Sequence, residues 1–454
     1  MQKRAPFRFK GESLSGVKKV MKKIVKRILM KLRLYDILSV TIYENRLLFK
    51  VLLCYLRYCR LLKLAKKKPL NEKIRVLFIV SEIAKWKEQS LYEEMEKSGD
   101  FYPIVGISAW NKQFGLDPDE LDAVHKRAIA FFSRLGDRCV RTVTCENGKV
   151  VYHNLLDFNP DIVFYTEQWG PCPEQHPFAV SKYALTCFLP YYVPTFGLMS
   201  IDCYPEVPRM SWTYFCLGEK WKQLYQWKLF WMCHCNKFVV TGHPTLDRFY
   251  EQRDRLPIKG YVIYAPHFAF PHPSQIEYYN IGTFDWSGMP ILQYAEAHPE
   301  IRWVFKPHPY LRAFLQSCGI MNKEEIDSYY ERWEKLGIAC YDSEYQELFL
   351  ESRAMITDSG SFLSEYGATG RPLIRLICSA DKCVSSRITR KMYGTYYQVR
   401  NLDELYDMFR MVIEQKCDPM KENRIEAIQR VGLANHNASQ RIVSYLKNVF
   451  AKST

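Results

Sequence analysis

The chain has 454 residues, of which 48% are hydrophobic and 25% are charged. This length and composition exclude a disordered chain and indicate a globular protein with two or three folded units. The net charge is +15, but residues 1–70 hold 20 Lys and Arg against three acidic residues, whereas the remaining 384 residues hold 44 against 46. Because the folded body is nearly neutral, we do not expect nucleic acid among its partners.

The 15 cysteines are odd in number and scattered through the chain, which favours a reducing compartment over a disulfide framework. Cys233, His234 and Cys235 are too closely spaced for the usual zinc sites, and no second Cys/His pair follows at a useful distance. We therefore expect no metal, and no cofactor apart from a donor substrate.

Residues 15–68 form a predicted helical segment in which apolar residues recur every three or four positions between lysines and arginines. Such basic amphipathic helices suit an anionic membrane surface. No apolar run is long enough to span a bilayer, and the N-terminus lacks the features of a signal peptide. We expect a cytoplasmic protein, peripheral on the inner face of the membrane. The alternative is a helical hairpin packed on the body, with its charges in solvent.

After residue 70 the pattern changes to short apolar runs that alternate with helical stretches, which is typical of parallel sheets covered on both faces. One series of predicted strands comprises 74–80, 101–107, 161–165 and 238–240. A second series comprises 261–266, 301–305, 338–340, 354–357 and 373–377. We predict an α/β fold with two doubly wound, Rossmann-like lobes at 71–255 and 256–420, a basic helical extension at 1–70 and one long C-terminal helix within 421–454.

In open α/β sheets, ligands bind beyond the carboxyl ends of the strands, so residues that follow strands are the informative ones. Lys306-Pro307-His308-Pro309 directly follows a predicted strand. A cation and an imidazole at this place suit binding of a phosphate or protonation of a leaving oxygen. Arg312 lies close behind and could add a second cation.

A second motif, Thr357-Asp358-Ser359-Gly360-Ser361, also follows a predicted strand and opens a helix that contains Glu365. Ser and Asp side chains cap such helix starts, and the free N–H groups there attract anions. The motif therefore predicts a diphosphate site, and the alternative is a helix cap without a ligand.

Three further residues could reach the same region. His243 and His267 each belong to a His–Pro combination at a strand end, and Asp285 lies in a loop between Gly282 and Gly288. A hinge role is the alternative for both histidines.

The paired motifs at 306–309 and 357–365 resemble the signature of the CDP-glycerol:poly(glycerophosphate) glycerophosphotransferase family, over roughly residues 238–376. The resemblance implies a two-lobed GT-B fold and a CDP-linked donor. It implies that His308 contacts the donor diphosphate and assists departure of CMP. It also implies that Glu365 binds the ribose hydroxyls. It further implies that Ser359 and Ser361 bind phosphate oxygens. From their chemistry, Lys306, Arg312 and the N–H groups of Ser359, Gly360 and Ser361 could stabilise the diphosphate charge, and Asp358 completes the predicted donor-binding residues.

The family's Trp-His-Gly element, whose His is the expected base on the acceptor hydroxyl, is absent. The corresponding region, 196–202, contains no His. Asp202, Glu167 or His176 could take this role instead.

The resemblance predicts transfer of an alditol phosphate, with glycerol phosphate as the first choice, to a lipid-linked glycan, a capsular polysaccharide or a teichoic-acid-like polymer. One alternative is a GT-B glycosyltransferase that uses a UDP-sugar, since the same architecture and Glu365 would serve it. Another is a non-catalytic, membrane-associated assembly protein, which the missing acceptor His favours and the intact Lys-Pro-His-Pro disfavours.

Overall fold

The computed structural model describes residues 35–69, 71–109, 118–146, 149–168, 172–193, 206–229, 237–252, 255–269, 281–340, 345–378 and 388–451. The chain divides into two compact units at Leu53 and Cys54, inside helix α2 (Tyr35–Ala65). Of the first unit, the structure describes only the beginning of α2. The second unit contains both large sheets.

In the described ranges the first sheet has seven parallel strands, in the order β3-β2-β1-β6-β7-β8-β9. The strands are β1 (Ile74–Val80), β2 (Phe101–Ile107), β3 (Cys139–Arg141), β6 (Ile162–Tyr165), β7 (Leu185–Phe188), β8 (Thr213–Cys216) and β9 (Phe238–Val240). The order reverses between β1 and β6, since β2 and β3 extend the sheet on one side of β1 and the later strands on the other. This reversal is the switch point at which doubly wound sheets bind ligands.

The helices of this lobe are α3 (Gln89–Ser98), α4 (Pro118–Phe131), α5 (Pro177–Val180), α7 (Glu206–Met210), α8 (Glu219–Leu229) and α9 (Pro244–Gln252). Short 3-10 turns occur at η1 (Ile83–Lys85), η2 (Ser133–Arg138) and η3 (Leu155–Phe158). An antiparallel hairpin of β4 (Val143–Glu146) and β5 (Lys149–Tyr152) stands beside the sheet. Strands β6, β7 and β8 are fully buried, and Phe78 of β1 stacks on Phe164 of β6 with ring centroids 4.9 Å apart.

The second sheet has, in the same described ranges, six parallel strands in the order β12-β11-β10-β13-β14-β15. They are β10 (Tyr261–Ala265), β11 (Trp303–Phe305), β12 (Ile338–Ala339), β13 (Ser352–Thr357), β14 (Leu373–Leu376) and β15 (Tyr397–Val399). The helices are α10 (Phe284–Ala297), α11 (Leu311–Ser317), α12 (Lys323–Leu336), α13 (Gln346–Glu351), α14 (Gly360–Glu365), α15 (Arg390–Tyr393) and α16 (Leu402–Met408). A 3-10 turn at Gly367–Thr369 follows α14, and a π-helix at Phe409–Glu414 extends α16. This strand order is that of a Rossmann fold, so the prediction of two doubly wound lobes is confirmed.

The single C-terminal helix predicted within 421–454 is wrong. The chain forms α17 (Lys421–Val431) and α18 (Ala438–Phe450), separated by a turn that contains two left-handed residues, Gly432 (φ 88°) and Asn437 (φ 64°). Glycine suits position 432 because a side chain there would be strained by the positive φ and would meet the backbone of Leu217.

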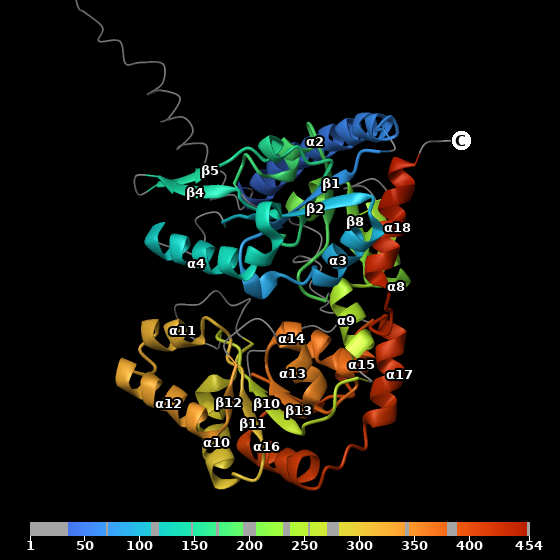
Figure 1. Cartoon of the computed structure of the whole chain (residues 1–454). Helices are drawn as coiled ribbons and strands as arrows, with labels where there is room; N and C mark the ends of the chain where they lie inside the picture. The colour runs from blue at the N-terminus through green and yellow to red at the C-terminus, as the bar shows by residue number, and fades with distance from the viewer. Residues whose placement is uncertain are drawn as a thin grey trace, which may run out of the picture. The chain divides into compact units, whose positions relative to one another are not determined.

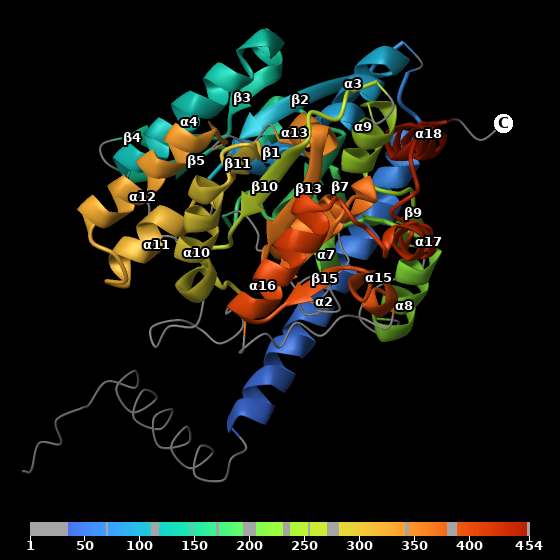
Figure 2. The ribbon, with the colours of Figure 1, turned by 90° about the horizontal axis from the view of Figure 1, so that it is seen from below.

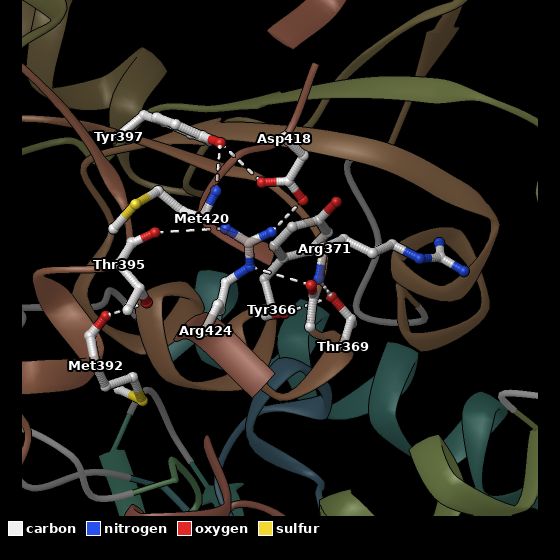
Figure 3. Close-up of polar contacts among 10 residues, drawn as sticks. Tyr366, Thr369, Arg371, Met392, Thr395, Tyr397, Asp418, Met420 and Arg424 are labelled. Atoms are coloured by element: carbon white, nitrogen blue, oxygen red, sulfur yellow. Dashed lines mark hydrogen bonds and ion pairs between the residues drawn. The ribbon is translucent and has the colours of Figure 1, made fainter. Parts of the chain in front are cut away.

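Helix α17 contacts both lobes, and its C-terminal end accepts a hydrogen bond from Trp221 of the first lobe at 3.2 Å. Arg424 of α17 is buried against the second lobe, where it donates to the carbonyl oxygen of Gly370 at 3.0 Å (Figure 3). Helix α18 packs beside α3 and α9 of the first lobe (Figures 1 and 2). Both carboxylate oxygens of Asp247 on α9 accept N–H groups of the first residues of α18, Ala438 and Ser439, at 2.7 Å. The chain therefore returns to the first lobe after completing the second.

The part of α2 that belongs to the second unit packs on the first lobe. The hydroxyl of Tyr58 lies 2.6 Å from Thr186 Oγ1 and donates to the carbonyl oxygen of Met210 at 2.8 Å. Arg57 donates to the carbonyl oxygen of Phe178 at 2.9 Å. Arg57 is one of the basic residues predicted to face a membrane, but its side chain binds the first lobe instead. In the described ranges we find no helix whose length and apolarity would let it span a bilayer.

Candidate functional site

Three neighbouring strands of the second sheet, β11, β10 and β13, present the predicted donor motifs at their carboxyl ends. Lys306 and His308 follow β11, His267 follows β10, and Asp358 and Ser359 follow β13. The ring centroid of His267 lies 5.0 Å from that of His308, and the N–H of His267 donates to Asp358 Oδ1 at 2.6 Å. The two motifs that were paired from the sequence are therefore parts of one site, joined by His267.

Asp358 holds the loops of this edge together. Its Oδ2 accepts from the N–H of Thr283 at 2.7 Å and from the hydroxyl of Thr283 at 2.9 Å, while Oδ1 accepts from His267. Burial raises the pKa of the carboxyl to about 6, and the hydrogen bonds oppose that shift. Since both oxygens are used within the protein, Asp358 positions the segments after β10 and before α10. Its contact with a donor stays a prediction.

His308 is a neutral hydrogen-bond donor at this edge. Its Nδ1 accepts the N–H of Tyr310 at 3.2 Å, which places the proton of the neutral ring on Nε2. Burial and then the neighbouring His267 and Lys306 hold the pKa of His308 well below its ordinary value. The Nε2–H group can thus donate to a phosphate oxygen, and a bound anion would raise the pKa toward that of a proton donor.

Two serine hydroxyls meet where α14 begins. Ser359 occupies the N-cap position, but its hydroxyl makes no capping bond to the helix. Instead, Ser359 Oγ lies 3.4 Å from Ser361 Oγ, on either side of the buried Gly360. The N–H of Ser359 donates to Thr357 Oγ1 at 3.0 Å, which fixes the turn. Both hydroxyls remain available as ligands of a polar group.

Glu365, predicted to bind a ribose, is enclosed by residues from both lobes. It is 1% exposed, and its Oε2 accepts from the hydroxyl of Tyr345 at 2.5 Å. Lys87 of the first lobe donates to that same hydroxyl, and its Nζ lies 3.8 Å from Glu365 Oε2. The ammonium groups of Lys87 and Lys306 lie 4.1 Å and 4.7 Å from the centre of the Tyr345 ring. Two cations therefore converge beside the predicted donor motif.

Sequence reasoning missed Lys87 and Tyr345. Lys87 comes shortly after β1, so the rule that selected the other residues by their place after a strand could have found it. Tyr345 stands just before α13, and no motif in the sequence marks it.

Arg312 and Asp285 have other surroundings. The Arg312 guanidinium, on α11, pairs with Asp327 of α12 and lies 5.1 Å from the centre of the Tyr330 ring. Asp285 is exposed in the first turn of α10, where partial burial raises the pKa of its carboxyl. The structure thus places the charge of Arg312 against α12, and the contact of either residue with a donor stays a prediction.

The first lobe presents a carboxylate at its own switch point. Glu167 follows β6, and its Oε1 accepts from the hydroxyl of Ser81, which follows β1. Its Oε2 accepts from Lys85 Nζ at 2.9 Å, and Lys85 also binds Glu82 at 3.0 Å. Burial raises the pKa of Glu167 to about 7, against the opposing effect of Lys85.

Two candidate histidines of the first lobe, His243 and His176, have structural partners. His243 Nε2 donates to the carbonyl oxygen of Pro190 at 2.7 Å, and its Nδ1 accepts the N–H of Thr245 at 3.3 Å. Burial lowers the pKa of His243 to about 4. His176 accepts the N–H of Phe178 at 3.2 Å and so caps α5. Asp202, the remaining candidate base, lies outside the described residues, as do Cys233–Cys235.

The edges of the two lobes influence each other electrostatically. The charge of Lys85 helps to lower the pKa of His308, and the charge of Glu167 helps to raise the pKa of Tyr310. Lys85 is two residues before Lys87, whose ammonium group contacts Tyr345 of the second lobe. Among the described residues, no group of three or more His, Cys, Asp or Glu is arranged to hold a metal ion.

No family model matches the chain, and no curated protein matches it. Among solved structures, the wall teichoic acid polymerase TagF matches with a TM-score of 0.54 at 13% identity, over 97% of this chain and 99% of that chain. A histidine variant of TagF gives 0.53 at 14% identity, over 97% and 98%. The chain has the GT-B fold. At this identity the likeness shows the fold alone.

The UDP-GlcNAc 2-epimerase from Neisseria meningitidis bound to UDP-GlcNAc is also similar, at 16% identity over 83% of this chain and 100% of that chain. Its TM-score of 0.49 is too low to carry an argument.

Proposed function

We propose that this protein transfers an alditol phosphate, with glycerol phosphate as the first choice, from a CDP-linked donor to a cell-surface polysaccharide or teichoic-acid-like acceptor. The observation that carries the proposal is the pair of contacts by which His267 joins His308 to Asp358. These contacts bring the two motifs of the resembled family to one strand edge. The likeness in fold to a wall teichoic acid polymerase supports the same proposal.

The chemistry of this edge suits a diphosphate. Transfer of a phosphoryl-linked group needs mainly positioning and stabilisation of negative charge. Lys306 and Lys87 supply two cations, His308 supplies an Nε2–H donor, and Ser359 and Ser361 supply hydroxyls. Such a set can hold the diphosphate and stabilise the charge that develops on departing CMP.

A peripheral position on an anionic membrane is part of the proposal. On the portion of α2 within the second unit, Leu56 and Leu64 are 55% and 50% exposed. Arg60, Lys63 and Lys67 are exposed on the same portion of the chain. Arg60 lies four residues from each leucine, Lys67 lies three residues after Leu64, and Lys63 directly precedes Leu64. An apolar stripe bordered by cations suits the headgroup region of an anionic bilayer, where a lipid-linked acceptor would lie.

Calorimetric titration of the wild-type protein and of His308→Ala with CDP-glycerol, CDP-ribitol, CMP, UDP and UDP-GlcNAc tests the donor assignment. We expect a CDP-alditol to bind and the substitution to weaken binding about tenfold or more, since a hydrogen bond to a charged group is lost. His298→Ala is the matched control, because His298 lies on the surface of the same lobe beside Glu300.

The result distinguishes the alternatives. Binding of the UDP compounds in place of CDP-alditols would assign the protein to the sugar transferases. Absence of binding by all five ligands would favour a non-catalytic assembly protein.

A further inference from the structure

The end of β6 carries a buried amide with no partner. Gln168, directly after Glu167, is 1% exposed, and neither its side-chain oxygen nor its nitrogen makes a hydrogen bond with the part of the chain that the structure describes. Leaving such a group unsatisfied costs about 1–3 kcal/mol. Buried polar groups are otherwise nearly always paired, so an amide with both atoms free points to a ligand that supplies the missing partners. An amide both donates and accepts, which matches a hydroxyl.

Glu167 is the carboxylate that directly follows β6, and it is held by Ser81 and Lys85 beside Gln168. Glu88 is 0% exposed, and its Oε2 is held by the N–H of Lys87 at 2.9 Å. Glu82 lies at the more exposed end of the Lys85 bridge, with 29% of its side chain exposed. The side chain of Glu167 is 10% exposed, between these two values, and Glu167 directly precedes Gln168 in the chain.

We infer that Glu167 is the base that takes the proton of the acceptor hydroxyl, that Gln168 binds a neighbouring oxygen of the same acceptor, and that Lys85 positions the carboxylate. The inference rests on the proposed function. It assigns the acceptor base, the role for which the sequence lacks the family's Trp-His-Gly histidine. It also names the acceptor class at this end of the site, a polyol or sugar with adjacent hydroxyls.

In the step we infer, the acceptor oxygen bonds to the β-phosphorus of the donor while the bond from that phosphorus to the bridging oxygen breaks. The electron pair of the broken bond remains on CMP, and the acceptor proton passes to Glu167. His308 donates its Nε2–H to the departing phosphate. A carboxylate with a pKa of about 7 suits this task, because it is ionised in mildly alkaline solution yet more basic than an ordinary Glu.

The titratable and charged groups that interact with Glu167 belong to four segments of the chain. Lys85 lowers the pKa of Glu167 and Glu82 raises it. The other groups that sense its charge are Glu88 before α3, Tyr191 after β7 and Tyr310 of the second lobe. Lys85 is the nearest cation, at 2.9 Å, so its removal should raise the pKa of Glu167.

The test measures CMP release from saturating CDP-glycerol, with glycerol or water as the hydroxyl, between about pH 5 and pH 9. We expect the wild-type rate to rise with pH to a plateau above about pH 7, and Glu167→Gln to reduce it at least about 100-fold while the affinity for CDP-glycerol is unchanged. Glu93→Gln, on the exposed surface of α3, is the matched control. Lys85→Met should shift the rising limb to higher pH.

Gln168→Met gives a readout that a structural role would not. Because the amide has no hydrogen-bond partner among the described residues, we expect no loss of stability on its replacement, but an increase in the KM for glycerol of about tenfold. The inference is wrong if Glu167→Gln stays within threefold of wild type, or if the wild-type protein binds CDP-glycerol and releases no CMP. It is also wrong if Lys85→Met leaves the pH profile in place. Failure of CDP-glycerol to bind at all would instead overturn the proposed function.

Discussion

Lys87 Nζ and Glu365 Oε2 lie 3.8 Å apart, although the first belongs to the β1 end of one lobe and the second to α14 of the other. Their side chains are 5% and 2% exposed, and the hydroxyl of Tyr345 contacts both. The residue that the family resemblance assigns to a ribose therefore already has partners from both lobes. A ribose that reaches Glu365 must replace or share these contacts.

Lys87→Met should lower the free energy of unfolding by about 3 kcal/mol, because it leaves the buried Glu365 without its cation. In Lys87→Met combined with Glu365→Gln, the loss should be clearly smaller than the sum of the single losses. Urea denaturation of the four proteins measures this coupling. Additive losses would show that the two side chains do not interact.

Acid should destabilise the protein through His243. Burial lowers the pKa of this ring to about 4, whereas the unfolded chain has the ordinary value of 6.5. The unfolded state therefore binds the proton more readily, and stability that is complete above about pH 6.5 is lost as the pH falls toward 4. At pH 5 the loss from this one group is about 2 kcal/mol.

His243→Gln should remove that part of the acid sensitivity, so that its stability falls less than that of the wild type between pH 7.5 and pH 5. Urea midpoints at the two pH values give the comparison. Parallel losses in the two proteins would contradict the prediction.

Arg424 on α17 anchors the C-terminal segment through a buried ion pair (Figure 3). Its side chain is 0% exposed and pairs with Asp418, whose other oxygen accepts from the hydroxyl of Tyr397 at 2.7 Å. Arg424→Met should lower the free energy of unfolding by about 3–5 kcal/mol, since one partner of a buried pair is removed.

Arg430→Met provides the control, because Arg430 pairs with Glu426 on the exposed side of the same helix, with both side chains more than half exposed. It should change stability by less than about 1 kcal/mol. Equal effects of the two substitutions in thermal unfolding would mean that the Arg424 network adds nothing beyond a surface pair.

Leu56→Glu should weaken attachment to phosphatidylglycerol vesicles by at least about tenfold, since burial of a leucine contributes about 2 kcal/mol and the new charge is repelled by the lipid. Vesicle sedimentation measures the bound fraction. Leu402→Glu, at a 38% exposed leucine of the second lobe, should bind as the wild type does. High salt should weaken wild-type binding, and phosphatidylcholine vesicles should bind less. Equal binding to both lipids would argue against an anionic membrane partner.

The sequence predicted the elements whose signal is local. Ile74–Val80 and Phe101–Ile107 are largely apolar runs, and they form the interior strands β1 and β2. The strands it missed are short, such as β3 (Cys139–Arg141) and β15 (Tyr397–Val399). Their pairing with a neighbouring strand defines them more than their composition does.

The break between α17 and α18 was missed for a similar reason. The apolar spacing on both sides of Gly432 is helical, but the turn is held by contacts with the first lobe, where Asn435 Nδ2 donates to the carbonyl oxygen of Leu217 at 3.1 Å. A single sequence does not show that the chain returns to the first lobe after it has formed the second.

The sequence by itself determined two doubly wound lobes and the place of Lys306, His308 and Ser359 at strand ends, because hydrophobic runs and the motifs that follow them are local properties. Only the tertiary structure decided which partners the individual side chains contact. In the folded protein, Asp358 accepts hydrogen bonds from the loops around it, and His243 donates to the carbonyl oxygen of Pro190. Glu365 is paired with Lys87 and accepts a hydrogen bond from Tyr345. The roles of these side chains depend on burial and on partners brought together from distant parts of the chain, and those long-range contacts exist only once both sheets have formed.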